Sequence, residues 1–242
     1  MKTLAFAKRN FIEIIREPLN LIFGIGFPSV LILLLSAIQA NVPVSLFEIN
    51  RLAPAMTVFG LSFMTLFSAT IIAKDRESAF LTRLYATPMR ALDFILGYTL
   101  PMLPIALVQS LICFIIGACL GMTVTVNTLL AWILILPISV IFISLGLLCG
   151  SLLDVRAVGG LCGALLTNLT SWLSGIWFDL ELVGGVFKRI ASVLPFIHAT
   201  ELERAVSMGD FTSFIPHFIW IIGYGAVLTA LSVWAFLRQM RK

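Results

Sequence analysis

Six long apolar stretches constrain the fold of this sequence more than any other feature. Each holds about 20 or more residues and keeps Lys, Arg, Asp and Glu at or beyond its ends, and about 20 apolar residues in a helix cross the hydrocarbon core of a bilayer. With 60% hydrophobic and 12% charged residues in 242, a soluble fold could not bury so much apolar surface. We predict an all-α integral membrane protein, a single domain over residues 1–242 with six transmembrane helices. The stretches are residues 19–39, 52–73, 94–121, 128–153, 158–178 and 218–237.

The distribution of positive charge predicts the orientation. With six spans, 12 of the 16 Lys and Arg residues share a side with both termini, and four lie on the other side. Cytoplasmic connections are rich in Lys and Arg, so both termini are predicted to be cytoplasmic in a multi-pass protein of the cell membrane. The net charge of +4 therefore reflects topology and attraction to anionic lipids, and it is no argument for nucleic acid as a partner.

Residues 1–18 precede the first span and are amphipathic. Leu4, Phe11 and Ile14 share a helical face, whereas Lys8 and Glu13 lie largely elsewhere. This pattern predicts an interfacial helix on the inner leaflet, and an ordinary cytoplasmic extension of the first span is the alternative.

A long charged segment lies in the predicted cytoplasmic loop of residues 74–93. Apolar residues recur there at helical spacing among Arg76, Glu77 and Arg83, and Pro88 ends the helix because proline disfavours helical geometry at the residue before it. The segment therefore predicts a short amphipathic helix. Its charge alone fits a helix on the membrane surface as well as it fits a docking element. The apolar stripe consists of Phe80, Leu81, Leu84 and Tyr85.

Several kinds of site are not indicated by the sequence. The four cysteines lie in apolar stretches without zinc-site spacing, and His198 and His217 are 19 positions apart without a companion, so we expect neither a metal nor a bound cofactor. No lysine follows a glycine, so the phosphate-binding GxxxxGK[ST] loop is absent. No ionisable residue lies in the middle of a predicted span, which argues against a proton- or sodium-coupled carrier.

Two other classes of membrane protein are alternatives to a transporter. The triplet Gly60-Leu61-Ser62 together with His217 could supply the Ser/His pair of an intramembrane serine protease, although Gly-x-Ser triplets also serve helix packing in membranes. A channel or a structural membrane component is the other alternative, and the sequence lacks a charge pattern that would form a selectivity ring.

Two blocks of sequence resemble the type 2 ABC transporter permeases. The first is the charged loop, although Ala79 stands where glycine is usual. The second is residues 173–178, followed by Pro195 and by residues 201–204, although residues 179–181 lack the family's usual proline. The residues of the first block that match are Asp75, Arg76, Glu77, Ala79, Leu81, Leu84, Thr87 and Pro88.

The resemblance implies a permease that is not itself an enzyme. It implies that the charged loop is a coupling helix docked on separate ATPase subunits, which would bind ATP and Mg, and that the permease pairs with a second copy or a close homologue. It further implies export of a small amphiphilic compound such as a drug, antibiotic or peptide from a bacterial or archaeal cell, with a lipid-linked polysaccharide as the alternative cargo. Residues 179–215 are expected to form an outer loop, either as a hairpin that re-enters the membrane or as a surface helix. The expected coupling residues are Asp75, Arg76, Glu77, Phe80, Leu81, Arg83, Leu84, Tyr85, Thr87 and Pro88.

Hydroxyl-bearing residues recur at helical spacing in the second and fifth stretches. Such stripes let helices approach closely and exchange hydrogen bonds, and this explains any one residue as well as substrate contact does. The resemblance implies that these two spans line a passage between two permease copies. The candidate path residues are Ser62, Thr65, Ser68, Thr167, Asn168, Thr170, Ser171 and Ser174.

Overall fold

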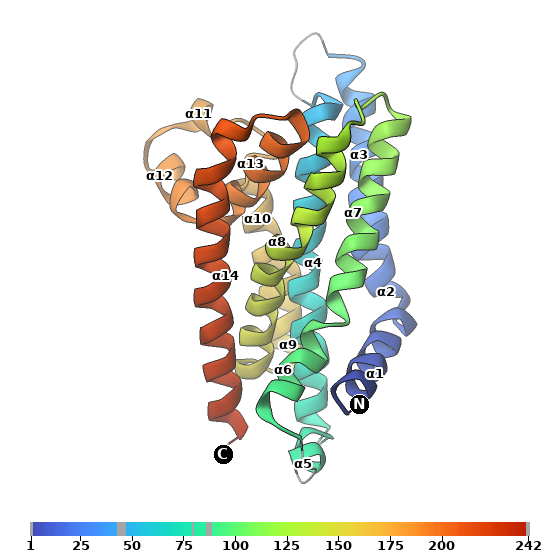
Figure 1. Ribbon diagram of the computed structural model, residues 1–242, viewed down its shortest axis with the longest axis vertical. Helices are drawn as coiled ribbons and strands as arrows, with labels where there is room; N and C mark the ends of the chain where they lie inside the picture. Colours follow the sequence, from blue (N-terminus) through green and yellow to red (C-terminus); the bar gives the residue numbers. More distant parts are fainter. Residues whose placement is uncertain (1, 43–46, 79, 86–88, 241–242) are drawn as a thin grey trace.

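The chain forms an elongated bundle of helices with two distinct ends (Figure 1). The computed structural model describes residues 2–42, 47–78, 80–85 and 89–240. Both termini and α5 (Phe80–Tyr85) lie at one end, which we call the terminal end, and α11 (Leu180–Val183) and α12 (Gly185–Val193) lie at the other, the distal end. The remaining helices are α1 (Lys2–Arg16), α2 (Pro18–Leu21), the π-helix η1 (Ile22–Gly26), α3 (Phe27–Gln39), α4 (Ile49–Glu77), α6 (Ala91–Thr99), α7 (Met102–Cys119), α8 (Val126–Leu152), α9 (Val155–Val158), the π-helix η2 (Gly159–Leu166), α10 (Thr167–Leu173), α13 (Pro195–Met208) and α14 (Phe211–Met240).

Five of the six predicted spans form helices that are long and apolar enough to cross a membrane. Among the described residues these are Pro18–Gln39, Ile49–Glu77, Leu92–Cys119, Val126–Leu152 and Phe211–Gln239. The predicted stretch 158–178 is instead a run of α9, η2 and α10 that ends at Leu173, and a left-handed turn follows at Gly175 (φ 69°). It is less apolar because Asn168 and several hydroxyls occupy it. Its crossing of the membrane stays a prediction.

Proline shapes the third predicted stretch. The helix breaks between α6 and α7, where Pro101 stands, because proline lacks an N–H and clashes with the preceding turn. Pro104 falls in the first turn of α7, and Pro137 lies inside the continuous helix α8. The third predicted stretch therefore forms two helices that meet at Pro101.

Helix α4 is the central element of the bundle. Of the most apolar segment of α4, 89% is buried inside the protein, whereas the corresponding segments of the first span and of α14 are 24% and 22% buried. It packs against α3, α7, α8 and α13. The exposed outer helices are therefore the ones available to lipid or to another protein, whereas α4 contacts the rest of its own chain.

Small residues set the close approach of α4 and α8. A Cβ atom at Gly146 would lie 1.8 Å from Ser68 Oγ and 2.5 Å from the carbonyl oxygen of Thr65, and one at Gly150 would lie 2.6 Å from the carbonyl oxygen of Ala69. Across this contact, the Thr65 hydroxyl donates to the carbonyl oxygen of Phe142 at 2.9 Å. Close backbone approach with hydrogen bonds between helices is the usual way in which membrane helices associate.

Replacing Gly146 with valine is therefore expected to separate α4 from α8. Overpacking of this kind costs about 1–3 kcal/mol of the free energy of unfolding, measured as thermal unfolding of the protein in detergent. Gly223→Val on α14 is the matched control, because a Cβ atom there would have no heavy atom within 4 Å. Equal stability of the two variants would contradict this account of the contact.

Helix α13 lies within the distal end of the bundle and packs against α4, α8 and α14. Most of its side chains are buried, including Phe196, Leu202 and Val206, whereas α12 exposes Val186, Ile190 and Val193 to a large degree. The expected outer loop thus contains two different parts, an exposed helix and a buried one. Its depth in a bilayer stays a prediction.

Candidate coupling site at the terminal end

The site is built around a buried carboxylate at the end of α4. Asp75 has a side chain only 2% exposed, and Arg9 of α1 donates to both of its oxygens, at 2.6 and 2.7 Å. The hydroxyl of Tyr98 on α6 donates to the same carboxylate at 2.8 Å. A two-pronged arginine contact of this kind fixes both position and angle. Asp75 therefore ties α1 and α6 to the end of α4.

Arg76 and Glu77 tie the same end of α4 to the end of α8. The Arg76 guanidinium donates to the carbonyl oxygens of Ser151 and Leu153, at 2.6 and 2.5 Å. Glu77 accepts a hydrogen bond from the backbone N–H of Val155 at 2.9 Å. The last carbonyls and first N–H groups of helices have no partner within their own helix. These two side chains supply such partners at the junction of α8 and α9.

The structure thus divides the predicted docking segment into two parts. Asp75, Arg76 and Glu77 belong to the last turn of α4 and make contacts within the chain. Helix α5 carries the remaining described members of the set, which are Phe80, Leu81, Arg83, Leu84 and, at its last position, Tyr85. Thr87 and Pro88 lie outside the described residues. Docking on an ATPase stays a prediction.

Helix α5 is anchored on one side and open on the other. Leu81 is 3% exposed, and the Phe80 ring packs beside Phe6 with ring centroids 6.5 Å apart. The Arg9 guanidinium lies over the Phe80 ring, 4.4 Å from its centroid, where a cation is attracted to the aromatic face. Leu84 is half-buried and packs partly against the hydrophobic core, whereas Arg83 is exposed and is available to a partner protein.

Helix α1 packs along α6. Phe6 contacts Tyr98 edge to face, with centroids 5.0 Å apart, and a Cβ atom at Gly97 would lie 2.1 Å from the Phe6 ring. Asn10 donates its side-chain amide to the carbonyl oxygen of Gly97 at 2.9 Å. The predicted amphipathic helix is therefore present, and part of its apolar face is buried against the protein. Leu4, Ile12 and Ile15 remain exposed.

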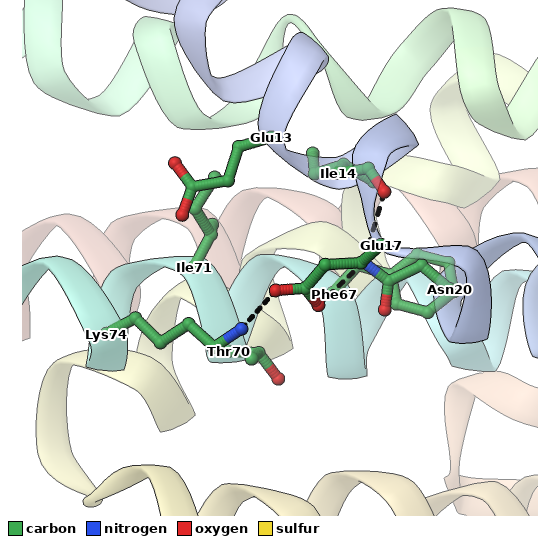
Figure 2. Close-up of a pocket in the computed structure, with 8 residues that line it drawn as sticks. All are labelled: Glu13, Ile14, Glu17, Asn20, Phe67, Thr70, Ile71 and Lys74. Atoms are coloured by element: carbon green, nitrogen blue, oxygen red, sulfur yellow. Dashed lines mark hydrogen bonds and ion pairs between the residues drawn. The ribbon is translucent and has the colours of Figure 1, made fainter.

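A small polar cavity lies where α1 and α2 meet α4, and Figure 2 shows its lining. Its volume is about 10 Å³, which is room for about one water molecule. The amino group of Lys74 points at the carboxylate of Glu17 and forms an ion pair with it. Burial raises the pKa of Glu13, and the neighbouring Arg9 opposes the rise. The cavity is too small for an organic substrate.

Most of the candidate path residues face the interior of this chain. Ser62, Ser68, Thr170, Ser171 and Ser174 are buried and donate to carbonyl oxygens of their own helices. Such bonds satisfy a hydroxyl without a ligand.

The remaining three candidate path residues differ from one another. Thr65 bonds across to α8, as described above, and buried Thr167 bonds within its own helical run. Asn168 is exposed, and its side-chain amide donates to the carbonyl oxygen of Ala164 at 2.8 Å. A contact between these eight residues and substrate stays a prediction.

The two histidines meet in space although they are far apart in the sequence. Nδ1 of His198 and Nδ1 of His217 are 2.9 Å apart, and His198 also bonds the carbonyl oxygen of Ser192. Within the described residues no group of three or more His, Cys, Asp or Glu side chains is placed to hold a metal ion. Ser62 bonds the carbonyl of Phe59. Ser62 and His217 thus bond other groups, and the contacts of a catalytic pair are not formed between them.

Sequence reasoning missed three residues that matter to the structure. Arg9 and Tyr98 complete the Asp75 contact from α1 and α6, and no spacing rule links positions so far apart. Glu203 lies in the block of residues 201–204 that resembles the permease family, and its burial was not predicted. Its side chain is 0% exposed in α13, and burial raises its pKa well above the ordinary range. The alternation of apolar and charged residues in that segment was the available signal.

The comparisons with known proteins agree with this architecture. The family model described as ABC-2 type transporter matches residues 1–208, which include α5, the coupling candidate, and most of the bundle. A search of curated proteins gave no match. With a match over most of its length, the chain belongs to the ABC-2 type transporter family, whose members are membrane permease components of ABC transporters.

Proposed function

We propose that this chain is the permease subunit of an ATP-driven exporter that moves a small amphiphilic compound, such as a drug, antibiotic or peptide. Two copies of the chain, or one copy and a close homologue, would form the passage, and separate ATPase subunits would bind ATP and Mg. The terminal end, with its Arg and Lys side chains, would face the cytoplasm. The runner-up cargo is a lipid-linked polysaccharide.

The observation that supports the proposal most is the connection from α5 to the centre of the bundle. Phe80 and Leu81 anchor α5, and the Arg9–Asp75 pair joins the adjoining end of α4 to α1. Helix α4 then continues to the distal end, where it packs against α13. A displacement of α5 by an ATPase would therefore act on a helix that runs the full length of the bundle, and rigid elements of this kind carry alternating-access changes.

A second copy has a surface available to it. Helices α3 and η2 expose much of their sides, and Cβ atoms at Gly159 and Gly160 would have no heavy atom within 4 Å. Small residues at an exposed membrane helix allow close approach of another helix. Asn168 lies in the same helical run and is exposed, so we place it beside the passage.

The proposal is tested by co-expressing the tagged chain with each soluble protein from the same genome that carries a GxxxxGK[ST] loop. The expected results are co-purification and ATP-dependent uptake of a fluorescent amphiphile into inside-out vesicles. An ATPase whose GxxxxGK[ST] lysine is replaced by alanine is the control, and it should bind without driving uptake. A chain that moves the amphiphile without any ATPase, or that binds none, would contradict the assignment.

A further inference from the structure

Glu203 is the buried carboxyl group that the proposed coupling and transport roles leave unexplained. Its side chain is 0% exposed, and neither of its oxygens has a hydrogen-bond partner among the described residues. One turn later on the same face of α13, the Ser207 hydroxyl is also buried without a described partner. Two unsatisfied polar groups at i and i+4 are unusual, because buried polar groups in native proteins are nearly always bonded.

Two contacts between α13 and α8, one on each side of Glu203, show what surrounds its side chain. The rings of Phe196 and Phe142 are 6.1 Å apart, and a Cβ atom at Gly209 would lie 2.7 Å from Asn127 Nδ2. Helix α13 therefore runs beside α8 from Phe142 to Asn127, with Glu203 between these points. The α8 residues in this interval that are 0% exposed are Ala131, Ile135, Ile138, Ser139 and Ile141. The hydroxyl of Ser139 donates to the carbonyl oxygen of Leu136 in its own helix.

No charged group of the described residues bonds the Glu203 carboxyl. Arg204 donates to the carbonyl oxygens of Arg51 and Gly175 and pairs with Glu201. Helices α8 and α10 contain no Asp, Glu, Lys, Arg or His. The other titratable or charged groups on the elements packed against this part of α13 are Arg51 and the N-cap residue Glu48 at the start of α4, His198 on α13 itself, Lys188 and Arg189 on α12, Asp210 before α14, and His217 and Tyr224 on α14.

A lone carboxylate in this place would be very costly. Removing an unpaired charge from water costs several kcal/mol even after the protein relaxes, and a buried acid avoids this cost by keeping its proton. We propose that Glu203 is a proton-binding site: with α13 packed against α8 its side chain is the neutral acid, and it releases that proton to water when the two helices separate. The release step rests on the proposed function, because separation at the distal end is the opening step of alternating access.

The proposal predicts the direction in which pH shifts the equilibrium between the packed and the open arrangement. The packed arrangement holds one proton more than the open one, so acid favours packing and alkali favours opening. Between the pKa of an exposed glutamate and the raised pKa of Glu203, the ratio of open to packed protein rises about tenfold for each pH unit. In Glu203→Gln, an uncharged mimic of the acid, this dependence disappears.

Infrared spectroscopy of the purified chain in liposomes tests the proton site. At about pH 7, where exposed carboxyls are ionised, the C=O stretching band of one protonated carboxylic acid is expected in the native chain. It should be absent from Glu203→Gln and present in the control Glu201→Gln. A spectrum of Glu203→Gln identical to that of the native chain would overturn the site. A pH titration of the native chain gives a second test. If its carboxylic acid band disappears between about pH 5 and about pH 7, the carboxyl is ionised at neutral pH and the proposed proton site is overturned.

A second arm separates this proposal from the proposed function. The permease with its ATPase, trapped with ATP and vanadate, is expected to lose the Glu203 band, and a band that persists in the trapped complex would overturn the release step. An ATPase that fails to bind would contradict the proposed function, whereas the band of the isolated chain still decides whether Glu203 holds a proton.

Discussion

Replacing Arg9 with alanine is expected to lower the free energy of unfolding by about 3 kcal/mol, because it leaves the buried carboxylate of Asp75 without its charged partner. Asp75 is 2% exposed, and of the side chains described above its carboxylate would keep the Tyr98 hydroxyl. The same change removes the guanidinium from the face of Phe80. We therefore expect α5 to lose its fixed position before the rest of the bundle unfolds.

Thermal unfolding in detergent and proteolysis near residue 80 would measure these two effects. Glu13→Gln is the matched control, because Glu13 also pairs with Arg9 but is 32% exposed, and exposed pairs contribute about 1 kcal/mol or less. The double variant Arg9→Ala, Asp75→Asn should recover part of the stability, since no buried charge remains. If Arg9→Ala were no less stable than Glu13→Gln, the Arg9–Asp75 pair would have no special structural role.

Replacing Leu84 with aspartate is expected to uncouple the ATPase from transport. Leu84 is half-buried against the core and follows exposed Arg83 in α5, and apolar anchors near the centre of an interface dominate its binding energy. A loss of about 2 kcal/mol at such an anchor weakens binding about 30-fold. Co-purification of the ATPase and substrate-stimulated ATP hydrolysis would both fall.

The stability of the isolated permease separates uncoupling from unfolding. Leu84→Asp should lower the temperature of thermal unfolding less than Leu81→Asp does, because Leu84 is half-buried whereas Leu81 is 3% exposed. Arg83→Ala should have a smaller effect on coupling, since exposed charges contribute little to affinity. Intact assembly and intact coupled hydrolysis in Leu84→Asp would remove α5 from the docking surface.

The sequence predicted the helices well because hydrocarbon length and apolar runs are local properties. Five stretches became helices long enough to cross a membrane, and the break at Pro101 followed from the missing N–H of proline. The stretch 158–178 was predicted too long, because the turn at Gly175 depends on a left-handed backbone that hydropathy does not reveal.

The site was predicted less completely because its contacts join distant parts of the chain. Asp75 and Arg76 looked like surface charge on an exposed helix, whereas their partners, Arg9 and Ser151, lie far away in the sequence. The burial of Glu203 likewise depends on how α13 lies against α8. Helical periodicity shows which residues share a face, and it does not show what that face contacts.

The two π-helical segments have a consequence for how the family can change in length. A π-helical turn holds more residues than an α-helical turn and is commonly a single-turn bulge in an α-helix, so η1 and η2 resemble insertions already absorbed by the helices that contain them. Loss of one residue within either segment would convert it toward α geometry and leave the flanking faces nearly in place. The same loss in the middle of α4 would rotate every later side chain by about 100°. The first span and the helical run of residues 155–173 are therefore the ones in which single-residue length variation among homologues should be tolerated.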